Sequence, residues 1–446
     1  MLESGFCEVF NTQNGFKLVA EDNMNKNELI SSAHEILKMN DLGGYTIPTH
    51  GLYPFQWNWD AAITALGWMK FDEERAWQEL HYLVKGQWEN GMIPHIIFHE
   101  NVDSYFPNAT VWGVEREVAT TAISQPPVLV SVIKIMLEQA KDQDSAQQHL
   151  EQLMPSLIAY HQWWYNERDP ENTGLVVSYH PWESGMDNSP AWDESLANVP
   201  PVEWDYQRKD TQHIDADERP HKFEYDRFLY LVDFYKKSKF DSELIYKDCP
   251  YKMYDVGIIS ILHKATKDLI ALTRFTGGFD QVASELELNL ARTQQAFPSL
   301  WHDELGSHLN KDAITGKYSE VLTTGTLMAL YGGLVTPEQL PKVEALLSDW
   351  LEVTPYGISS TYGKCEQYEP QRYWRGPVWL HINWLLALGV ADYKLTELEQ
   401  KIKVASTKLI VEQGYFEYFD SESGKGCGGG HFSWTAATAL HWLLNE

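Results

Sequence analysis

Two carboxylates stand close together in a polar segment that is bounded by tryptophans. Residues 182–189 read WESGMDNS, so that Glu183 and Asp187 lie among Gly, Asn and Ser, and Trp192 follows. This composition predicts a loop. Indole rings offer a flat, weakly apolar surface to a sugar, and a carboxyl group among such rings would be partly desolvated, which favours the neutral form of a general acid. The alternative is a structural loop in which Asp187 caps the next turn.

A further carboxylate with aromatic neighbours stands near the C-terminus. Glu417 lies in the segment 414–420, GYFEYFD, and the glycine-rich segment 426–434, GCGGGHFSW, follows it. Glycoside hydrolysis uses two carboxyl groups, one to protonate the leaving oxygen and one to activate water or attack the sugar. The pair Asp187 and Glu417 therefore points to a glycosidase.

The composition narrows the class of protein. The 446 residues include 63 acidic and 35 basic ones, and the formal net charge of -28 argues against nucleic acid or an anionic membrane as partner. The 18 Trp and 23 Tyr suit a carbohydrate-active protein, although a large core also uses such rings. The four cysteines lack the spacing of zinc ligands, so we expect no metal among the site residues and no disulfide. We also expect no cofactor, while a bound structural cation stays open. With neither a signal-like segment nor an apolar run of roughly 20 residues, we expect a cytoplasmic protein.

Apolar spacing predicts a largely helical chain with few strands. Paired helices without a fixed repeat favour a closed toroid of paired helices, an (α/α)6 barrel, over a solenoid. No linker or change of composition divides the chain, so we expect one all-α domain over residues 1–446. The expected helices cover residues 28–40, 61–70, 71–91, 116–140, 145–167, 224–239, 254–275, 280–297, 319–331, 337–352, 376–390, 395–413 and 433–444, with a short strand near 175–178.

A polar insert, residues 193–224, directly follows the Asp187 loop. A long polar loop beside an active site is typical of a lid, the alternative being a solvated connection. Because the net charge repels anions at long range, an anionic substrate needs a local cation. Arg219 is our first candidate, because an arginine fork suits a carboxylate, although the basic residues of the insert could equally be surface charges.

Three motifs, taken in their order along the chain, resemble those of glycoside hydrolase family 63. They are WESGMDNSP at 182–190, RYWRGPVWLHINWLL at 372–386 and GYFEYFD at 414–420. Related motifs occur in trehalases and other inverting (α/α)6 glucosidases, and the resemblance runs from about Tyr53 to the C-terminus. Within the family, the chain looks like the bacterial glucosylglycerate and mannosylglycerate hydrolases, because it lacks a large N-terminal β-domain.

The resemblance implies an inverting mechanism with Asp187 as the general acid and Glu417 as the general base. Glu183 is the nearest rival for the acid, but we favour a role as hydrogen-bond partner of the sugar or of a neighbouring loop. Trp57 and Asp60 match family residues that line the sugar subsite, although Asp60 could instead be the N-cap of the next helix.

The remaining substrate-binding candidates lie in loops that the resemblance places around the sugar. We expect Pro377 just inside a helix start, which puts Trp374 and Arg375 at the mouth of the site and Trp379 on the first turn, where a core role is the alternative. Gln125 resembles a sugar-binding Gln of the family, with a local turn contact as the alternative. The full set of binding candidates is Tyr53, Trp57, Asp60, Gln125, Trp182, Glu183, Arg219, Tyr373, Trp374, Arg375, Gly376 and Trp379.

We expect an inverting α-glycosidase that hydrolyses a small anionic glycoside such as glucosylglycerate or mannosylglycerate. The alternatives are an α-glucosidase acting on another small glucoside or disaccharide, and a non-hydrolytic sugar-binding protein, lyase or epimerase on the same barrel. The two carboxylates argue against plain binding, and the 16 histidines form no obvious catalytic pair. The choice between glucose and mannose, and self-association into a homo-oligomer, stay open at this level.

Overall fold

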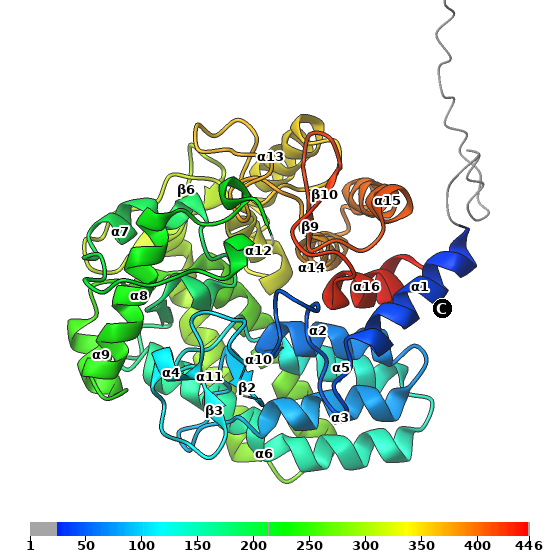
Figure 1. The fold of residues 1–446 in the computed structure, drawn as a ribbon, viewed down its shortest axis with the longest axis horizontal. Coiled ribbons are helices and arrows are strands. Elements are labelled where there is room, and N and C mark those ends of the chain that lie inside the picture. The colour runs from blue at the N-terminus through cyan, green and yellow to red at the C-terminus, as the bar shows by residue number, and fades with distance from the viewer. Residues whose placement is uncertain (1–24, 101, 213, 445–446) are drawn as a thin grey trace, which may run out of the picture.

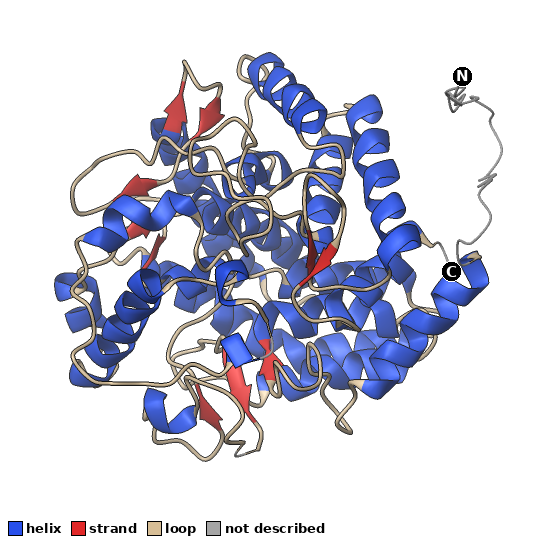
Figure 2. Cartoon of the chain, turned by 45° about the horizontal axis from the view of Figure 1, so that its top comes forward, coloured by secondary structure: helices blue, strands red, loops and turns tan. Residues whose placement is uncertain are grey.

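The computed structural model describes residues 25–100, 102–212 and 214–444, and most of its regular elements are helices (Figure 2). Within these residues, six helices contact one another in chain order, and the last returns to the first, so that they close a ring. Two of them, α2 and α12, are buried at every position, as expected for helices without a solvent-facing side. The ring consists of α2 (Asn58–Trp68), α5 (Leu129–Gln139), α10 (Val256–Thr276), α12 (Thr324–Gly332), α14 (Leu380–Asp392) and α16 (Ser433–Thr438).

An outer layer of helices packs around this ring. Each outer helix is amphipathic and buries only part of its surface; α11, for example, buries three side chains along 17 residues. Ring and outer layer together form the predicted (α/α)6 barrel (Figure 1). The outer helices are α1 (Lys26–Met39), α3 (Glu73–Val84), α6 (Gln143–Arg168), α11 (Asp280–Ala296), α13 (Leu340–Val353) and α15 (Thr396–Gln413).

Three predicted helices start at least four residues later than their apolar spacing suggested, and one of them, expected over 319–331, begins as α12 only at Thr324. In the segment 116–140, only Leu129–Gln139 is helical, because Pro126 and Pro127 have no backbone N–H and restrict the residue before them. The segment 376–390 becomes helical only at Leu380. Its Val378 instead pairs with Phe419, exchanging hydrogen bonds of 2.7 and 2.9 Å. Pro377 therefore lies before the helix rather than inside its first turn.

Short antiparallel strands join the loops at the ends of the helices. The strand expected near 175–178 is present as β4, while β1 contains Trp57 and β9 directly follows Glu417. The pairings follow the orders β1–β2–β3, β4–β5–β8, β6–β7 and β10–β9. Their bounds are β1 (Gln56–Trp57), β2 (Ile96–Phe98), β3 (Ala119–Thr120), β4 (Val177–Ser178), β5 (Met253–Tyr254), β6 (Trp301–His302), β7 (Ser307–His308), β8 (Lys311–Asp312), β9 (Tyr418–Phe419) and β10 (Gly426–Cys427).

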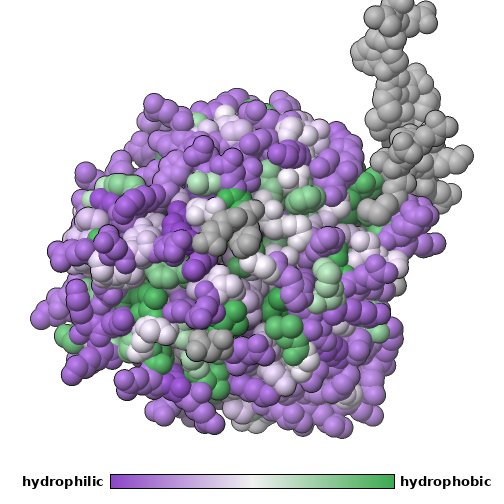
Figure 3. All heavy atoms as spheres, viewed as in Figure 1, coloured by the Kyte–Doolittle hydropathy of each residue, from purple (hydrophilic) through white to green (hydrophobic). Residues whose placement is uncertain are grey.

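The insert 193–224 is mostly irregular and connects two helices on one side of the ring. It begins with α7 (Asp193–Ala197) and ends as α8 (Lys222–Lys237) begins. The short helix α9 (Ser242–Asp248), which apolar spacing did not predict, lies on the same side (Figure 1), and α4 (Ala109–Trp112) packs against α8. On the face of the molecule that is turned to the viewer in Figure 1, hydrophilic side chains cover most of the rim, and apolar side chains lie nearer the middle (Figure 3).

Candidate active site

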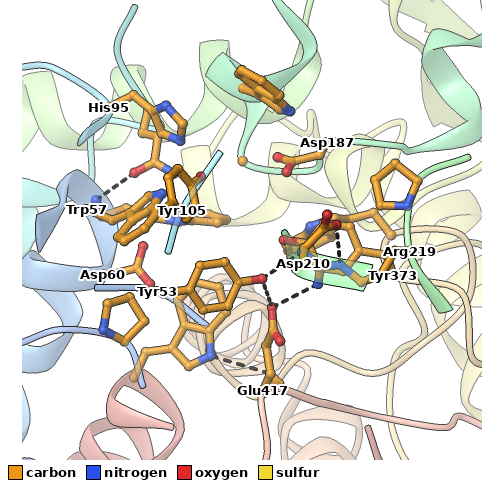
Figure 4. Close-up of a pocket in the computed structure, with 18 of the residues that line it drawn as sticks. Tyr53, Trp57, Asp60, His95, Tyr105, Asp187, Asp210, Arg219, Tyr373 and Glu417 are labelled. Carbon is orange, nitrogen blue, oxygen red and sulfur yellow. Dashed lines mark hydrogen bonds and ion pairs between the residues drawn. The ribbon is translucent and has the colours of Figure 1, made fainter. Parts of the chain in front are cut away.

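A cavity with an empty volume of about 740 Å³, partly open to solvent, lies where the loops of the ring meet the insert. Its wall is largely aromatic and includes four carboxylates (Figure 4). Ten of the predicted residues line it: Tyr53, Trp57, Asp60, Gln125, Trp182, Asp187, Arg219, Tyr373, Trp374 and Glu417.

The loop that carries Asp187 is held against the cavity wall by close packing. Gly185 adopts the left-handed conformation with φ +69°, and a Cβ atom there would lie 2.6 Å from the ring of Trp59. The indole N–H of Trp192 donates to the carbonyl oxygen of Met186 at 2.8 Å. Only glycine permits this approach, so the sequence SGMD fixes where Asp187 enters the cavity.

Asp187 is suited to hold a proton at neutral pH. Burial raises the pKa of its carboxyl group from 3.8 to about 8, against the charge of Arg219, which lowers it, and with that of Glu417, which raises it. A carboxyl group that remains neutral near pH 7 can donate its proton to a leaving oxygen. This is the property that a general acid requires.

Glu417 faces the cavity from a different side (Figure 4) and is surrounded by donors. The hydroxyl of Tyr53 donates to its Oε1 at 2.7 Å, and the backbone N–H of Gly429 donates to its Oε2 at 3.0 Å. Arg219 Nη1 lies 3.5 Å from Oε1. Burial raises the pKa of Glu417 above its ordinary value of 4.5, although Arg219 and these hydrogen bonds lower it. Donors of this kind favour the carboxylate, which is the form of a general base.

The glycine run after Glu417 gives this carboxylate its space. Gly428 has φ +68°, and a Cβ atom at this position would lie 2.4 Å from Glu417 Oε2. The hydrogen bond from Gly429 comes from the same run. The segment GCGGG therefore allows the backbone to pass directly beside the carboxylate.

Asp60 and Gln125 both lie at the first turn of α2. Trp57 is the N-cap of this helix, so Asp60 lies inside the first turn and is not the cap. Burial raises the pKa of Asp60 well above its ordinary value, and the nearby Glu417 and Asp187 raise it further. Gln125 Oε1 accepts the backbone N–H of Trp59 at 3.2 Å, which satisfies a free donor at the helix start.

Stacked aromatic rings support the part of the cavity wall that Tyr373 and Trp374 form. The rings of Trp374 and Trp379 are parallel with centres 3.9 Å apart, and Trp374 is the member that lines the cavity. Tyr373 has φ +39°, and the guanidinium of Arg219 lies 4.0 Å from the centre of its ring. Such a wall offers flat faces to a sugar and a cation beside them.

Residues 53–435 match the family model described as the mannosylglycerate hydrolase MGH1-like glycoside hydrolase domain. The match covers most of the chain. The chain belongs to this glycoside hydrolase family.

Individual relatives agree along nearly the whole chain. The mannosylglycerate hydrolase MGH1 of Selaginella moellendorffii is 44% identical over 421 residues, which are 94% of this chain and 86% of the relative. The glucosylglycerate hydrolase of Mycolicibacterium hassiacum is 32% identical over 435 residues, 93% of this chain and 98% of that one. The crystal structure of the GH63 mannosylglycerate hydrolase from Thermus thermophilus in complex with Tris superposes with a TM-score of 0.90 at 42% identity. It covers 93% of this chain and 99% of its own.

Two of the predicted binding residues of this glycoside hydrolase do not line the cavity and are held by ion pairs instead. Glu183 is fully buried, and its Oε1 lies 2.5 Å from Arg168 Nη2. Arg375 makes a bidentate contact with Asp193 at 2.8 and 2.9 Å and also contacts Glu369 at 3.0 Å. Neither side chain is at the mouth of the site.

Gly376 and Trp379 also lie outside the cavity wall. A Cβ atom at Gly376 would lie 2.1 Å from the carbonyl oxygen of Glu369, so this glycine serves a close backbone approach. Trp379 lies behind Trp374 and donates its indole N–H to the carbonyl oxygen of Tyr373 at 3.1 Å. The core role considered for Trp379 is the one that the structure supports.

Several cavity residues were missed by the sequence analysis. Trp59 and Trp434 stand inside motifs that were recognised, so their type and position were a usable signal. Asp210 lies in the insert, where it pairs with Arg208 at 2.5 Å and with Arg219 at 3.4 Å; nothing in the sequence distinguished it from the other acidic residues of the insert. The remaining residues in this group are Pro48, His95, Tyr105, Phe106, Gly185, Pro220, Tyr225 and Phe432.

Two further features concern only residues 25–100, 102–212 and 214–444. In these ranges, no group of three or more His, Cys, Asp or Glu side chains is arranged to hold a metal ion. No helix in them has the length and apolar character that crossing a bilayer requires.

Proposed function

We propose that this protein hydrolyses α-linked mannosylglycerate or glucosylglycerate with inversion at the anomeric carbon. Asp187 protonates the glycosidic oxygen as the bond to the anomeric carbon breaks. Glu417 accepts a proton from the water that attacks the opposite face of the sugar. The products are the free sugar and glycerate, and the two carboxyl groups end with exchanged protonation states.

The observation that carries this proposal is the contrast between two carboxyl groups in one cavity. Burial keeps Asp187 protonated near pH 7, whereas Tyr53, Gly429 and Arg219 surround Glu417 with donors that favour its anion. Burial raises both pKa values, but only Glu417 has a hydrogen-bond donor on each of its two oxygens, and this difference in environment assigns Asp187 as the acid and Glu417 as the base. For inversion we expect the carboxyl groups to stand roughly 6.5–9.5 Å apart, which leaves room for the water.

The anionic end of the substrate is proposed to bind beside Arg219. Among the described residues, Arg219 is the only Lys or Arg side chain that lines the cavity. It is shared by Asp210 and Glu417, but its Nη1 has no hydrogen-bond partner in the described part of the chain. Because the other charged groups of the wall are carboxylates, the glycerate carboxylate is attracted at this position alone. The names of the relatives as mannosylglycerate and glucosylglycerate hydrolases support the same substrate class.

The insert is proposed to be a lid that brings Arg219 to the site. Arg208 binds the side chain of Asp210 at 3.0 Å, and Asp210 in turn contacts Arg219 at 3.4 Å. Asp210, Arg219 and Pro220 all line the cavity. We propose that ring and lid act as one catalytic domain, while a cytoplasmic location and a homo-oligomeric state stay predictions.

A substrate panel tests the proposal. The wild-type protein is assayed with mannosylglycerate, glucosylglycerate, trehalose, kojibiose and an uncharged aryl glucoside. We expect the highest kcat/KM for one of the two glycerates. A clear preference for an uncharged glucoside would overturn the glycerate proposal and support the disaccharide alternative.

The variant Arg219→Ala tests the anion subsite separately. We expect it to lower kcat/KM for the glycosylglycerate far more than for the aryl glucoside, because loss of one partner of a desolvated charge pair costs on the order of 2–5 kcal/mol. Some loss on both substrates follows from the lid and from the contact with Glu417. Equal losses on the two substrates would remove Arg219 as the receptor of the carboxylate.

A further inference from the structure

We propose that the buried ion pair of Glu183 and Arg168 is a positioning element that places Asp187 for proton transfer. Neither residue lines the cavity, so the pair acts through the turn that carries the acid. The inference rests on the proposed function, because it assigns a support to the general acid of that reaction.

The carboxylate of Glu183 accepts hydrogen bonds from three segments of the chain. Its Oε1 accepts hydrogen bonds from Arg168 Nη2 at 2.5 Å and from the backbone N–H of Ser124 at 3.4 Å. Its Oε2 accepts the backbone N–H of Tyr179 at 2.9 Å. One fully buried carboxylate thus ties the end of α6, the loop before α5 and the chain entering the Asp187 turn.

The arginine partner is itself held in a fixed place. Arg168 is the last residue of α6, and its side chain is 4% exposed. The guanidinium carbon lies 4.4 Å from the ring centre of Trp163 and 4.8 Å from that of Tyr179. Because both charges are removed from water, removal of one partner leaves the other uncompensated.

Hydrogen bonds and close packing hold the turn between Glu183 and Asp187, so that a shift of one residue is transmitted to the other. The hydroxyl of Ser184 donates to the carbonyl oxygen of Pro181 at 2.5 Å and accepts the N–H of Met186 at 2.9 Å. Gly185 within it packs so closely on the cavity wall that a Cβ atom would not fit. A shift of Glu183 therefore moves Asp187 relative to the bound sugar.

The hydrogen bond from Ser124 to Glu183 also links the ion pair to the cavity wall on which the sugar is proposed to lie. Ser124 precedes Gln125, whose Oε1 accepts the N–H of Trp59 at 3.2 Å. The Ser124 hydroxyl is also 2.7 Å from the hydroxyl of Tyr160, which donates to the carbonyl oxygen of Gln125 at 3.2 Å. Glu183 thus sets the spacing between the acid and the wall on which the sugar lies.

A substrate whose leaving group needs no proton distinguishes a misplaced general acid from a general loss of structure. In the natural substrate, the glycerate oxygen must receive a proton from Asp187 as the bond breaks. In the matching glycosyl fluoride, fluoride departs as an anion while water attacks and Glu417 accepts the proton. A displaced acid therefore slows the first reaction much more than the second.

The test measures kcat and KM of wild type, Glu183→Gln and Arg168→Lys on mannosylglycerate or glucosylglycerate and on the corresponding α-glycosyl fluoride. A misplacement of about 1 Å can cost about 10²-fold. For Glu183→Gln we expect kcat for the glycerate to fall about 10–100-fold, with KM little changed and kcat for the fluoride within about threefold of wild type. Arg168→Lys keeps a cation, and it should show the same dependence on the leaving group with a smaller loss.

A second buried pair in the described chain provides the matched control. Arg75 Nη2 lies 2.9 Å from Glu79 Oε2 on the outer helix α3, with side chains 7% and 0% exposed, and neither residue lines the cavity. Glu79→Gln removes an equally buried charge. We expect it to lower Tm without making turnover depend on the leaving group.

The outcomes distinguish this inference from the proposed function. If wild type is active but Glu183→Gln loses both substrates equally, or behaves as Glu79→Gln does, the positioning role is overturned and the proposed function stands. If Glu183→Gln is not recovered in folded form, Arg168→Lys decides the question by the same ratio of rates. Wild type that hydrolyses neither substrate overturns the proposed function and this inference with it.

Discussion

Replacement of Asp187 by Asn should make the protein more stable and almost inactive at neutral pH. Burial raises the pKa of Asp187 from 3.8 to about 8, so the folded protein keeps a proton that the unfolded chain has released. Between pH 3.8 and about 8, ionisation of Asp187 in the unfolded chain lowers the free energy of unfolding by about 1.36 kcal/mol for each pH unit. At pH 7 the cost is on the order of 4 kcal/mol as an upper value. Asn has a similar size and cannot ionise, so Asp187→Asn avoids this cost.

The assay is thermal or denaturant unfolding of wild type and variant at two pH values. At pH 7 we expect Asp187→Asn to be the more stable protein. The advantage should shrink as pH falls toward the ordinary pKa of 3.8, where both states of the wild type are protonated. Turnover of the variant should fall by about 10²–10⁴-fold or more, because the leaving oxygen receives no proton.

Asp210 supplies a control of opposite sign. Burial raises the pKa of Asp210, but the hydrogen bond from Arg208 and the charge of Arg219 outweigh it and hold the pKa below its ordinary value. Its stabilising contribution is therefore present at pH 7 and lost as pH falls through that lowered pKa, so Asp210→Asn should destabilise the protein at pH 7. The reasoning on Asp187 is refuted if Asp187→Asn is no more stable than wild type at pH 7, or if its advantage is as large near pH 4.

Further predictions concern the pair and its surroundings. The pH profile of kcat/KM should be bell-shaped, with activity lost as pH rises past about 8 and Asp187 ionises, and lost at low pH as Glu417 is protonated. Tyr53→Phe removes a donor that lowers the pKa of Glu417, so the acid limb should move to higher pH; an unmoved limb would contradict this role. Gly428→Ala should lower kcat, because its Cβ would lie 2.4 Å from Glu417 Oε2. Gly316→Ala, at φ +73° with no atom within 4 Å, shares the unfavourable backbone conformation without the clash and should leave activity unchanged.

The sequence predicted the barrel and the two loops that bring Asp187 and Glu417 to one cavity, because both leave local signals. Apolar spacing marks helices that bury one face, and clustered Gly, Asn and Trp mark the loops of Asp187 and Glu417. The late starts of α5 and α14 depend on Pro126, Pro127 and the pairing of Val378 across the fold, which apolar spacing does not register.

The direction in which a polar side chain points is what the sequence could not supply. Glu183 and Asp187 stand four residues apart in one motif, yet one faces Arg168 in the interior and the other faces the cavity. Arg375 likewise occupies a recognised motif, but it pairs with Asp193 and does not line the cavity. Asp210 reaches the cavity only because the insert folds over it, and no local pattern indicates that path.

The stereochemistry of the first turnover tests the central claim most directly. Wild-type protein is mixed with α-mannosylglycerate or α-glucosylglycerate, and proton NMR spectra are recorded before the released sugar mutarotates. If Asp187 protonates the leaving oxygen while Glu417 directs water to the opposite face, the β-anomer should form first. Initial release of the α-anomer would contradict direct displacement and with it the roles assigned to both carboxylates.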